Sequence, residues 1–173
     1  SSLKKVIFAS SYLIYDPKLY ISSNKPEKSF RINENDLIFP RNTCGAAKFF
    51  HETQLKFLEN FDNIKFNSVS ARIFRVYGKN SKDIVSRWIR CLLKNEEILV
   101  YNKENRFDYI YADDVAEGLI RLSQSNISGM INLGNDKSRS IGELLQILKE
   151  HFPKMKIKYV DYDYPYEASQ ADM

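Results

Sequence analysis

The sequence has 173 residues, a mass of 20.3 kDa and a net charge of +4, which suits one domain or slightly more. Hydrophobic residues make up 43% and charged residues 28%, and the charges are well mixed, so the composition is that of a folded protein and does not favour a nucleic-acid partner. The apolar runs are too short for a membrane partner, and two isolated cysteines without an export signal predict a cytoplasmic location.

The first half of the chain predicts a strand, a loop, a helix and a second strand. The apolar run Val6–Ala9 is typical of a strand buried on both faces of a parallel sheet, and residues 16–41 predict a long surface loop. Asn42 or Thr43 can cap the helix that follows. This helix carries an apolar stripe that consists of Ala47, Phe50, Leu55, Leu58 and Phe61. The alternating segment 68–76 predicts the next strand.

The second half predicts shorter elements. Ser81 is expected to cap a helix with Trp88 on its apolar face, and the spacing of Asp114 and Glu117 resembles a capping box that opens another helix. A second capping box, Ser140 with Glu143, opens a helix that runs to Phe152. Short strands are expected at 98–101, 109–111, 130–134 and 157–160. Because strands and helices alternate, the sequence predicts the α/β class.

Polar side chains gather where the predicted strands end. Ser10 and Ser11 end the first strand, and Arg75 and Tyr77 end the second. Ligands of open α/β sheets bind beyond the carboxyl ends of the strands, so these residues are candidates for a site. Cys44 and Lys48 lie one turn apart and therefore share one face of the predicted helix.

Several kinds of site are not indicated by the sequence. The six glycines form neither G-x-G-x-x-G nor G-x-x-x-x-G-K-[ST], so a phosphate-cradling loop is not encoded within these residues. The two cysteines and two histidines form no C-x-x-C or H-x-x-x-H pair, so we expect no metal site.

Five segments, taken together, resemble the extended short-chain dehydrogenase/reductase family, in particular its NAD(P)-dependent nucleotide-sugar epimerases and dehydratases. In chain order these segments are VIFASSYLIYD, CGAAK, ARIFRVYG, FDYIYADDVAEGL and INLGN. They are similar to the family's Ser/Thr strand, Y-x-x-x-K helix, R-x-F-N-x-Y-G strand, R-D-F-x-Y-V-x-D segment and N-x-G segment. The resemblance covers nearly the whole chain.

The resemblance implies a Rossmann-like, doubly wound parallel sheet with a small α+β substrate-binding subdomain, seen here without its N-terminal half. Residues 1–80 would form the C-terminal half of the NAD(P)-binding domain. Residues 81–173 would form mainly the substrate-binding subdomain, with a strand and helix near 106–125 returning to the first domain. The open edge of the first strand would be covered by the missing half or by a partner chain.

The resemblance also implies a mechanism and roles for single residues. A family Tyr acts as acid and base toward a sugar hydroxyl, a Ser or Thr contacts the same oxygen, and a Lys holds the nicotinamide ribose of NAD or NADP. The implied catalytic residues are Ser11, Cys44 and Lys48, and Lys48, Ser10 and Phe74 would contact the cofactor. The implied substrate-binding residues are Tyr12, Arg75, Tyr77 and Arg106.

The sequence departs from the family pattern at the reacting position. Cys44 stands where the family has Tyr, and a thiol is shorter than a phenol, although Lys48 beside it could favour a reactive thiolate. Arg75 replaces the family Asn, and the family's phosphate-binding Arg falls on Phe107, with Arg106 beside it. Either Arg106 or Arg75 could therefore meet a substrate anion.

Two functions of different classes remain open. The first is an NAD(P)-dependent epimerase, dehydratase or reductase, that is, an isomerase, lyase or oxidoreductase, that acts on a nucleotide-activated sugar. The second is a catalytically silent subunit of the same fold that binds nucleotide sugars or serves as a scaffold. By resemblance, a homodimer through the helix from Thr43 is also expected.

Overall fold

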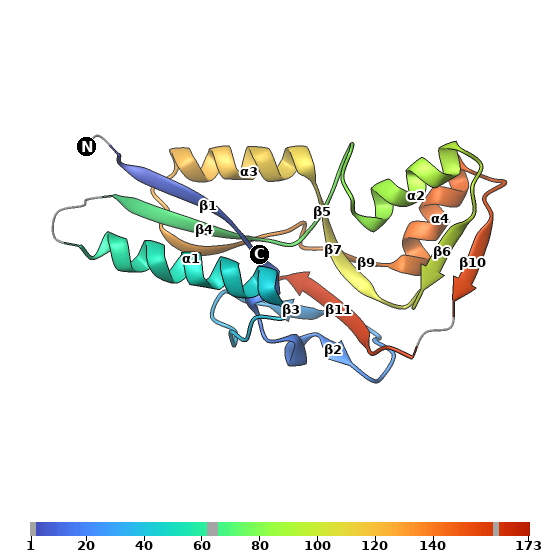
Figure 1. The fold of residues 1–173 in the computed structure, drawn as a ribbon, viewed down its shortest axis with the longest axis horizontal. Coiled ribbons are helices and arrows are strands. Elements are labelled where there is room, and N and C mark those ends of the chain that lie inside the picture. Colours follow the sequence, from blue (N-terminus) through green and yellow to red (C-terminus); the bar gives the residue numbers. More distant parts are fainter. Residues whose placement is uncertain (1–2, 62–65, 161–162) are drawn as a thin grey trace.

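The computed structural model describes residues 3–61, 66–160 and 163–173 (Figure 1). Its strands are β1 (Lys5–Ser11), β2 (Ile21–Ser22), β3 (Phe30–Ile32), β4 (Asn67–Ile73), β5 (Arg75–Tyr77), β6 (Ile98–Tyr101), β7 (Arg106–Tyr111), β8 (Gly129–Leu133), β9 (Ser138–Ser140), β10 (Ile157–Val160) and β11 (Tyr166–Ala171). Its helices are α1 (Thr43–Glu59), α2 (Ile84–Leu93), α3 (Ala112–Gln124) and α4 (Ile141–His151). The predicted α/β class is confirmed.

A parallel sheet of order β1-β4-β8 lies between α1 and α3 (Figure 1). Alternation along β4 explains how both faces are covered, because successive side chains of a strand point to opposite faces. Val69 and Ala71 pack in an apolar cluster with Leu122 of α3. The other face carries the small Ser70 and the buried Arg72, which meets α1. An apolar layer therefore holds α3, and a polar contact holds α1.

The first strand lies at the edge of this sheet. Among the described residues, β1 pairs only with β4, and residues 6–8 are half-buried while Ala9 is exposed. The prediction that Val6–Ala9 is buried on both faces is therefore wrong for this structure. The physical reason is that an edge strand has a neighbour on one side alone, which leaves its other edge open.

The predicted strand at 68–76 is in fact two strands that belong to different sheets. Strand β4 ends at Ile73, and β5 begins at Arg75 and pairs in parallel with β7. Between them the amide of Phe74 donates to the carbonyl of Leu133 at 3.0 Å. The chain thus crosses from the first sheet to the second at one residue.

The sequence predicts a long surface loop at 16–41, but the structure shows ordered elements in this segment. It contains β2 and β3, which both pair with β11, and the side chains of Tyr20 and Ile32 are buried in an apolar cluster. The partner strand β11 lies more than 120 residues further along the chain and was not predicted. Pairing with β11 is what converts this polar, proline-rich segment into ordered structure.

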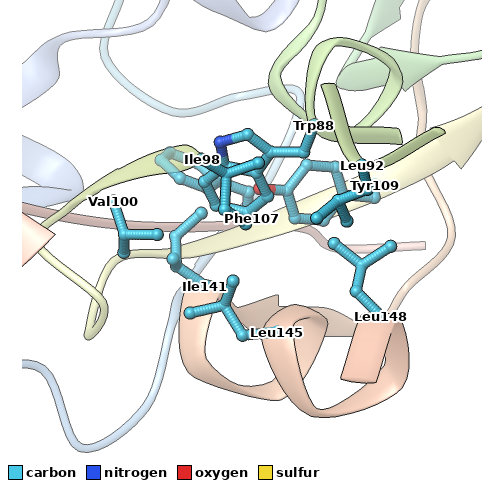
Figure 2. Close-up of a cluster of buried hydrophobic side chains, with 9 residues drawn as sticks. All are labelled: Trp88, Leu92, Ile98, Val100, Phe107, Tyr109, Ile141, Leu145 and Leu148. Carbon is cyan, nitrogen blue, oxygen red and sulfur yellow. The ribbon is translucent and has the colours of Figure 1, made fainter. Parts of the chain in front are cut away.

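A third apolar cluster lies between α2 and α4, against β6 and β7. Figure 2 shows Trp88 and Leu92 of α2 facing Leu145 and Leu148 of α4 across Tyr109. The predicted apolar face of α2 is therefore confirmed. The indole N–H of Trp88 donates to the carbonyl of Leu99 at 3.1 Å, so its polar atom is satisfied inside this core.

Helix α1 buries little of its predicted apolar stripe. Its buried residues are Gly45 and Glu52, whereas Phe50 is 59% and Phe61 is 51% exposed. The predicted stripe is therefore largely exposed within the described residues. The face of α1 that meets the sheet is instead the one that carries Glu52, because the underlying face of β4 is polar.

Two of the predicted helix caps differ from those in the structure. The N-cap of α2 is Asp83, which accepts from the amide of Ser86, whereas the prediction placed the cap at Ser81. Helix α3 has no side-chain cap, and Asp114 lies within its first turn. A carboxylate there still stabilises the helix, because it faces the positive end of the helix dipole.

The capping box of α4 is confirmed and supports a prediction. The Ser140 hydroxyl accepts from the Glu143 amide at 3.0 Å, and the Glu143 carboxylate accepts from the Ser140 amide at 2.5 Å. Loss of an N-cap hydroxyl costs about 1 kcal/mol, so Ser140→Ala should lower the free energy of unfolding by about that amount in urea denaturation. Ser123→Ala, an exposed serine near the end of α3, is the matched control and should change it much less.

The same box predicts how stability responds to acid. The hydrogen bond from the Ser140 amide lowers the pKa of Glu143. A carboxylate with a depressed folded pKa stabilises the fold above its unfolded pKa of about 4.3, and this stabilisation is lost as the pH falls through the lower folded value. The stabilisation that Glu143→Gln removes should therefore shrink below roughly pH 4 in urea denaturation.

The division of the chain into two domains stays a prediction. The sheet of β1 and β4 also includes β8 (Gly129–Leu133), which lies in the second half of the sequence. The helix α3, which packs on β1 and β4, follows β7 directly. Segments from both halves of the sequence thus build the first sheet.

Candidate active site

The first turn of α1 is fixed against the segment that follows β1. Asn42 caps the helix by accepting from the Gly45 amide at 2.9 Å. A β-carbon added at Gly45 would clash with the carbonyl oxygen of Leu13, so only glycine allows this approach. The contact places the face of α1 that carries Cys44 and Lys48 beside the carboxyl end of β1.

Lys48 reaches the end of β1. Its ammonium donates to the carbonyl of Ala9 at 2.6 Å and lies 5.0 Å from the centre of the Phe8 ring. An ammonium has three N–H donors, and the two others have no hydrogen-bond partner in the part of the chain that the structure describes. Ser11, two residues beyond Ala9, is half-buried, and Cys44, one turn before Lys48, is exposed. The Lys48 amine therefore lies at the carboxyl-terminal part of β1, where the Ser11 hydroxyl accepts from the Leu13 amide at 3.3 Å.

Ser10 lies beside Ser11 in sequence but belongs to a buried network. Its hydroxyl donates to the Glu52 carboxylate at 2.5 Å, and the same carboxylate receives two N–H bonds from Arg72 at 3.2 and 2.9 Å. Arg72 is 1% exposed and Glu52 is 7% exposed. The Ser10 hydroxyl therefore already has a partner that ties β1 to α1 and β4.

Tyr15 completes this network and is held neutral. Its hydroxyl accepts from Arg72 at 3.0 Å and donates to Asn132 at 2.7 Å. Burial raises the pKa of Tyr15 to about 12 despite the nearby guanidinium. This phenol is therefore unavailable as a base near neutral pH.

A second polar cluster surrounds Glu167 of β11, which is 5% exposed. Its carboxylate accepts from the Tyr12 hydroxyl at 3.0 Å and from Arg41 at 2.6 Å, and Arg75 approaches it at 3.4 Å. Burial also raises the pKa of Tyr12. Burial by itself lowers the pKa of Arg75, because it disfavours the charged guanidinium. The electrostatic attraction of Tyr12 and Glu167 raises this pKa by more, so the pKa of Arg75 lies above its usual value. Two guanidinium groups and one carboxylate give this cluster an excess positive charge.

Arg75 has unused hydrogen-bonding capacity. Its guanidinium lies 4.1 Å from the centre of the Phe107 ring, and its side chain is 38% exposed. The buried Nε of Arg75 and the buried hydroxyls of Tyr20 and Tyr109 have no hydrogen-bond partner in the described ranges. Each of these atoms can still take part in a hydrogen bond.

The other residues predicted for the site lie in different surroundings. Phe74 is 4% exposed and stacks on Tyr12, with ring centres 5.0 Å apart. Tyr77 packs on Tyr111. Arg106 pairs with Glu143 of α4 at 3.2 Å. The structure thus groups Tyr12, Phe74 and Arg75, and it places Lys48 and Ser11 at the end of β1.

Sequence reasoning did not identify Glu167, Arg41 or Tyr20 as candidates. Glu167 lies in β11, a strand that was not predicted, and Arg41 and Tyr20 lie in the segment that was interpreted as a loop. In the described ranges, no group of three or more His, Cys, Asp or Glu side chains is placed to hold a metal ion. No described helix is long and apolar enough to cross a bilayer.

The close approach of Gly45 supports a second prediction. Gly45→Ala should lower the free energy of unfolding by roughly 1–3 kcal/mol, because the new methyl group overlaps a backbone carbonyl and displaces the start of α1. Gly142→Ala in α4 is the matched control, since its β-carbon would meet its nearest neighbour at 3.6 Å, an ordinary contact. Urea denaturation measures both changes. A Gly45→Ala protein as stable as the control would contradict the prediction.

Comparison with known proteins identifies relatives of the chain. The model of the NAD dependent epimerase/dehydratase family matches residues 1–134. UDP-glucuronic acid decarboxylase 3 of Arabidopsis thaliana is 36% identical over 97 residues, which are 53% of this chain and 28% of that protein.

Solved structures share the fold. The UDP-N-acetylglucosamine 4-epimerase of Methanobrevibacter ruminantium M1, in complex with UDP-N-acetylmuramic acid, is 27% identical with a TM-score of 0.81 and covers 98% of this chain. The UDP-glucuronic acid 4-epimerase of Bacillus cereus, in complex with UDP-glucuronic acid and NAD, is 23% identical with a TM-score of 0.80 and covers 99%. This chain covers 54% of each of these two structures.

These likenesses confirm the Rossmann-like fold that was expected. Some relatives match most of this chain. The chain spans about half the length of these relatives. Because the family model covers 134 of the 173 residues, the assignment does not depend on one motif. The chain belongs to the NAD dependent epimerase/dehydratase family.

Proposed function

We propose that this chain supplies the acid–base and sugar-binding part of an NAD(P)-dependent enzyme that epimerises, dehydrates or reduces a nucleotide-activated sugar. The observation that carries the proposal is the position of Lys48, whose amine bonds the carbonyl of Ala9 one helical turn from Cys44 and close in sequence to Ser11. The relatives named for activity on UDP-sugars support the substrate class.

The donor set at the end of β1 fits the ribose end of a dinucleotide. Lys48 retains two N–H groups that can donate to ribose hydroxyls, and Ser11 offers a half-buried hydroxyl to a sugar oxygen. When bound, the nicotinamide would take up and return a hydride. The roles of this chain's residues are to orient the ribose through Lys48 and to hold a sugar hydroxyl at Ser11. The pyrophosphate would need donors beyond those of this chain, because its glycines form no phosphate loop.

We further propose that Arg75, rather than Arg106, holds the phosphate groups of the substrate. The Nε of each arginine lacks a partner within the described ranges, but Arg106 is 24% exposed and pairs with Glu143 at 3.2 Å, whereas Arg75 is 38% exposed and has the longer contact with its carboxylate. The 3.4 Å contact of Arg75 with Glu167 is long, and Arg41 at 2.6 Å can keep this carboxylate neutralised when Arg75 turns to an anion. A planar guanidinium suits bidentate binding of phosphate.

The two arginines can be tested against each other. Arg75→Ala should weaken the affinity of the full-length protein for a UDP-sugar by roughly tenfold to a hundredfold, because a charge-assisted hydrogen bond is worth about 1.5–3 kcal/mol. Arg106→Ala removes the same charge and should change this affinity little. Isothermal titration calorimetry measures both values. If both variants lost the same affinity for the UDP-sugar, the assignment of phosphate binding to Arg75 would be refuted.

A second candidate function has support from the reacting position. Cys44 carries a thiol where the acid–base phenol of the family would stand, and the nearby Tyr12 and Tyr15 are buried with raised pKa values. Neither tyrosine can serve as a base near neutral pH, which favours a catalytically silent subunit that binds nucleotide sugars or acts as a scaffold. Turnover of UDP- or dTDP-sugars by the full-length protein with added NAD supports the enzyme, and binding without turnover supports the silent subunit.

Cytoplasmic location and dimerisation remain proposals. We propose that α1 contributes to a homodimer or to contacts with the rest of the protein, because Phe50, Phe57 and Phe61 expose more than half of their side chains on this helix and at its end. The open edge of β1 lies on the same sheet and needs cover.

A further inference from the structure

A pocket of about 410 Å3 lies between α2 and α4, beside the turn that joins β8 to β9. Its volume falls in the range of small-molecule sites, and most of its wall is apolar, as is usual for such sites. The wall is formed by Val85 and Ile89 of α2 and by Leu144 and Ile147 of α4. Tyr109 and Leu148, which belong to the core shown in Figure 2, also line it. The pocket therefore has a buried, mostly apolar base.

The polar groups of the pocket include two cations, Lys137 and Arg139. Lys137, Arg139 and His151 line it, and none of the described residues that line it is acidic. The side chains of these three residues have no hydrogen bond or ion pair within the described part of the chain. Glu143 attracts Arg139 electrostatically, but its carboxylate is already bonded to a backbone amide and paired with another arginine. Asp136, next to Lys137, is likewise paired with an arginine.

We infer that this pocket binds a small amphipathic anion, with a ring or short hydrocarbon body between α2 and α4 and one carboxylate, sulfonate or phosphate group at Lys137 and Arg139. Two unpaired cations at the mouth of an apolar pocket recognise this chemistry, because the body removes apolar surface from water while the anion gains charge-assisted hydrogen bonds. The inference does not depend on the proposed function. Tyr77 lines the pocket and is also a proposed substrate residue, so the test leaves it unchanged.

Anilinonaphthalene sulfonate is a suitable probe, and phenylnaphthylamine, which has the same rings without the sulfonate, is its neutral counterpart. Fluorescence titration of the full-length protein measures both affinities. The double variant Lys137→Ala with Arg139→Ala should weaken binding of the sulfonate roughly tenfold or more and leave binding of the neutral probe within about twofold. Lys149→Ala removes a charge from α4 outside the pocket and should change neither affinity.

A second variant tests the apolar wall. Ile147→Asn should weaken the binding of both probes, because Ile147 lines the pocket and is 38% exposed, which makes the change tolerable for folding. Circular dichroism checks that each variant is folded. The inference would be overturned if the double variant bound the sulfonate as tightly as the original protein, or if Lys149→Ala caused an equal loss.

Discussion

Replacing Arg72 with alanine should lower the free energy of unfolding by about 3–5 kcal/mol, which is a large share of the stability of a domain. The reason is that Glu52, 7% exposed, would be left as a buried carboxylate without its guanidinium partner. The change also removes donors from Tyr15 and from the carbonyl of Glu34. Urea denaturation followed by circular dichroism measures the loss.

An exposed ion pair provides the control for this prediction. Arg121 pairs with Glu117 at 2.5 Å on α3, but the two side chains are 77% and 60% exposed. Pairs of this kind are worth roughly 0.3–0.5 kcal/mol, so Arg121→Ala should have a small effect. If Arg72→Ala proved no more harmful than Arg121→Ala, the buried network would not hold α1 to the sheet as described here.

The buried network also bears on function, because it fixes the helix that carries Lys48. Glu52 lies one turn after Lys48 on α1, and its carboxylate binds both Ser10 of β1 and Arg72 of β4. Together with the contact between Gly45 and Leu13, this fixes α1 at two points along its length. The amine of Lys48 is therefore positioned by interactions that involve neither cofactor nor substrate.

Local signals allowed the helices and most of the central strands to be predicted. The capping box of Ser140 and Glu143 and the apolar face around Trp88 each depend on residues close together in sequence. Segment 16–41 was misjudged because its structure comes from β11, a partner more than 120 residues away. The apolar stripe of α1 does not pack on the sheet, because the strand face beneath the helix is polar, which the helix sequence alone cannot show.

The candidate site was predictable where it depends on one helix turn or one strand end. The spacing of Cys44 and Lys48 and the position of Ser11 followed from the motifs, whereas the partners of Arg75 did not. Glu167 meets Arg75 only because β11 runs beside β7 in the folded chain. Charged pairs across such distances in sequence leave no local pattern by which to recognise them.

Replacing Cys44 with tyrosine should raise the turnover of a nucleotide sugar by the full-length protein about 10²–10⁴-fold, the usual contribution of a positioned acid–base group. Cys44 is exposed on the first turn of α1, so a larger side chain can be accommodated there. A phenol at this position would have the Lys48 ammonium one turn away and the end of β1 beside it. Turnover of UDP- and dTDP-sugars with added NAD is the measurement.

Phenylalanine at the same position separates chemistry from bulk. Cys44→Phe adds the same ring without the hydroxyl and should not raise turnover, and Cys44→Ser tests whether the thiol itself contributes to any basal rate. If Cys44→Tyr binds the UDP-sugar as well as the original protein does but gains no turnover, the acid–base assignment of this position fails and the silent subunit is the better account. A gain in Cys44→Tyr that is absent from Cys44→Phe can arise only from a hydroxyl placed beside Lys48 at the reacting bond, which is the geometry that the end of β1 and the first turn of α1 would provide.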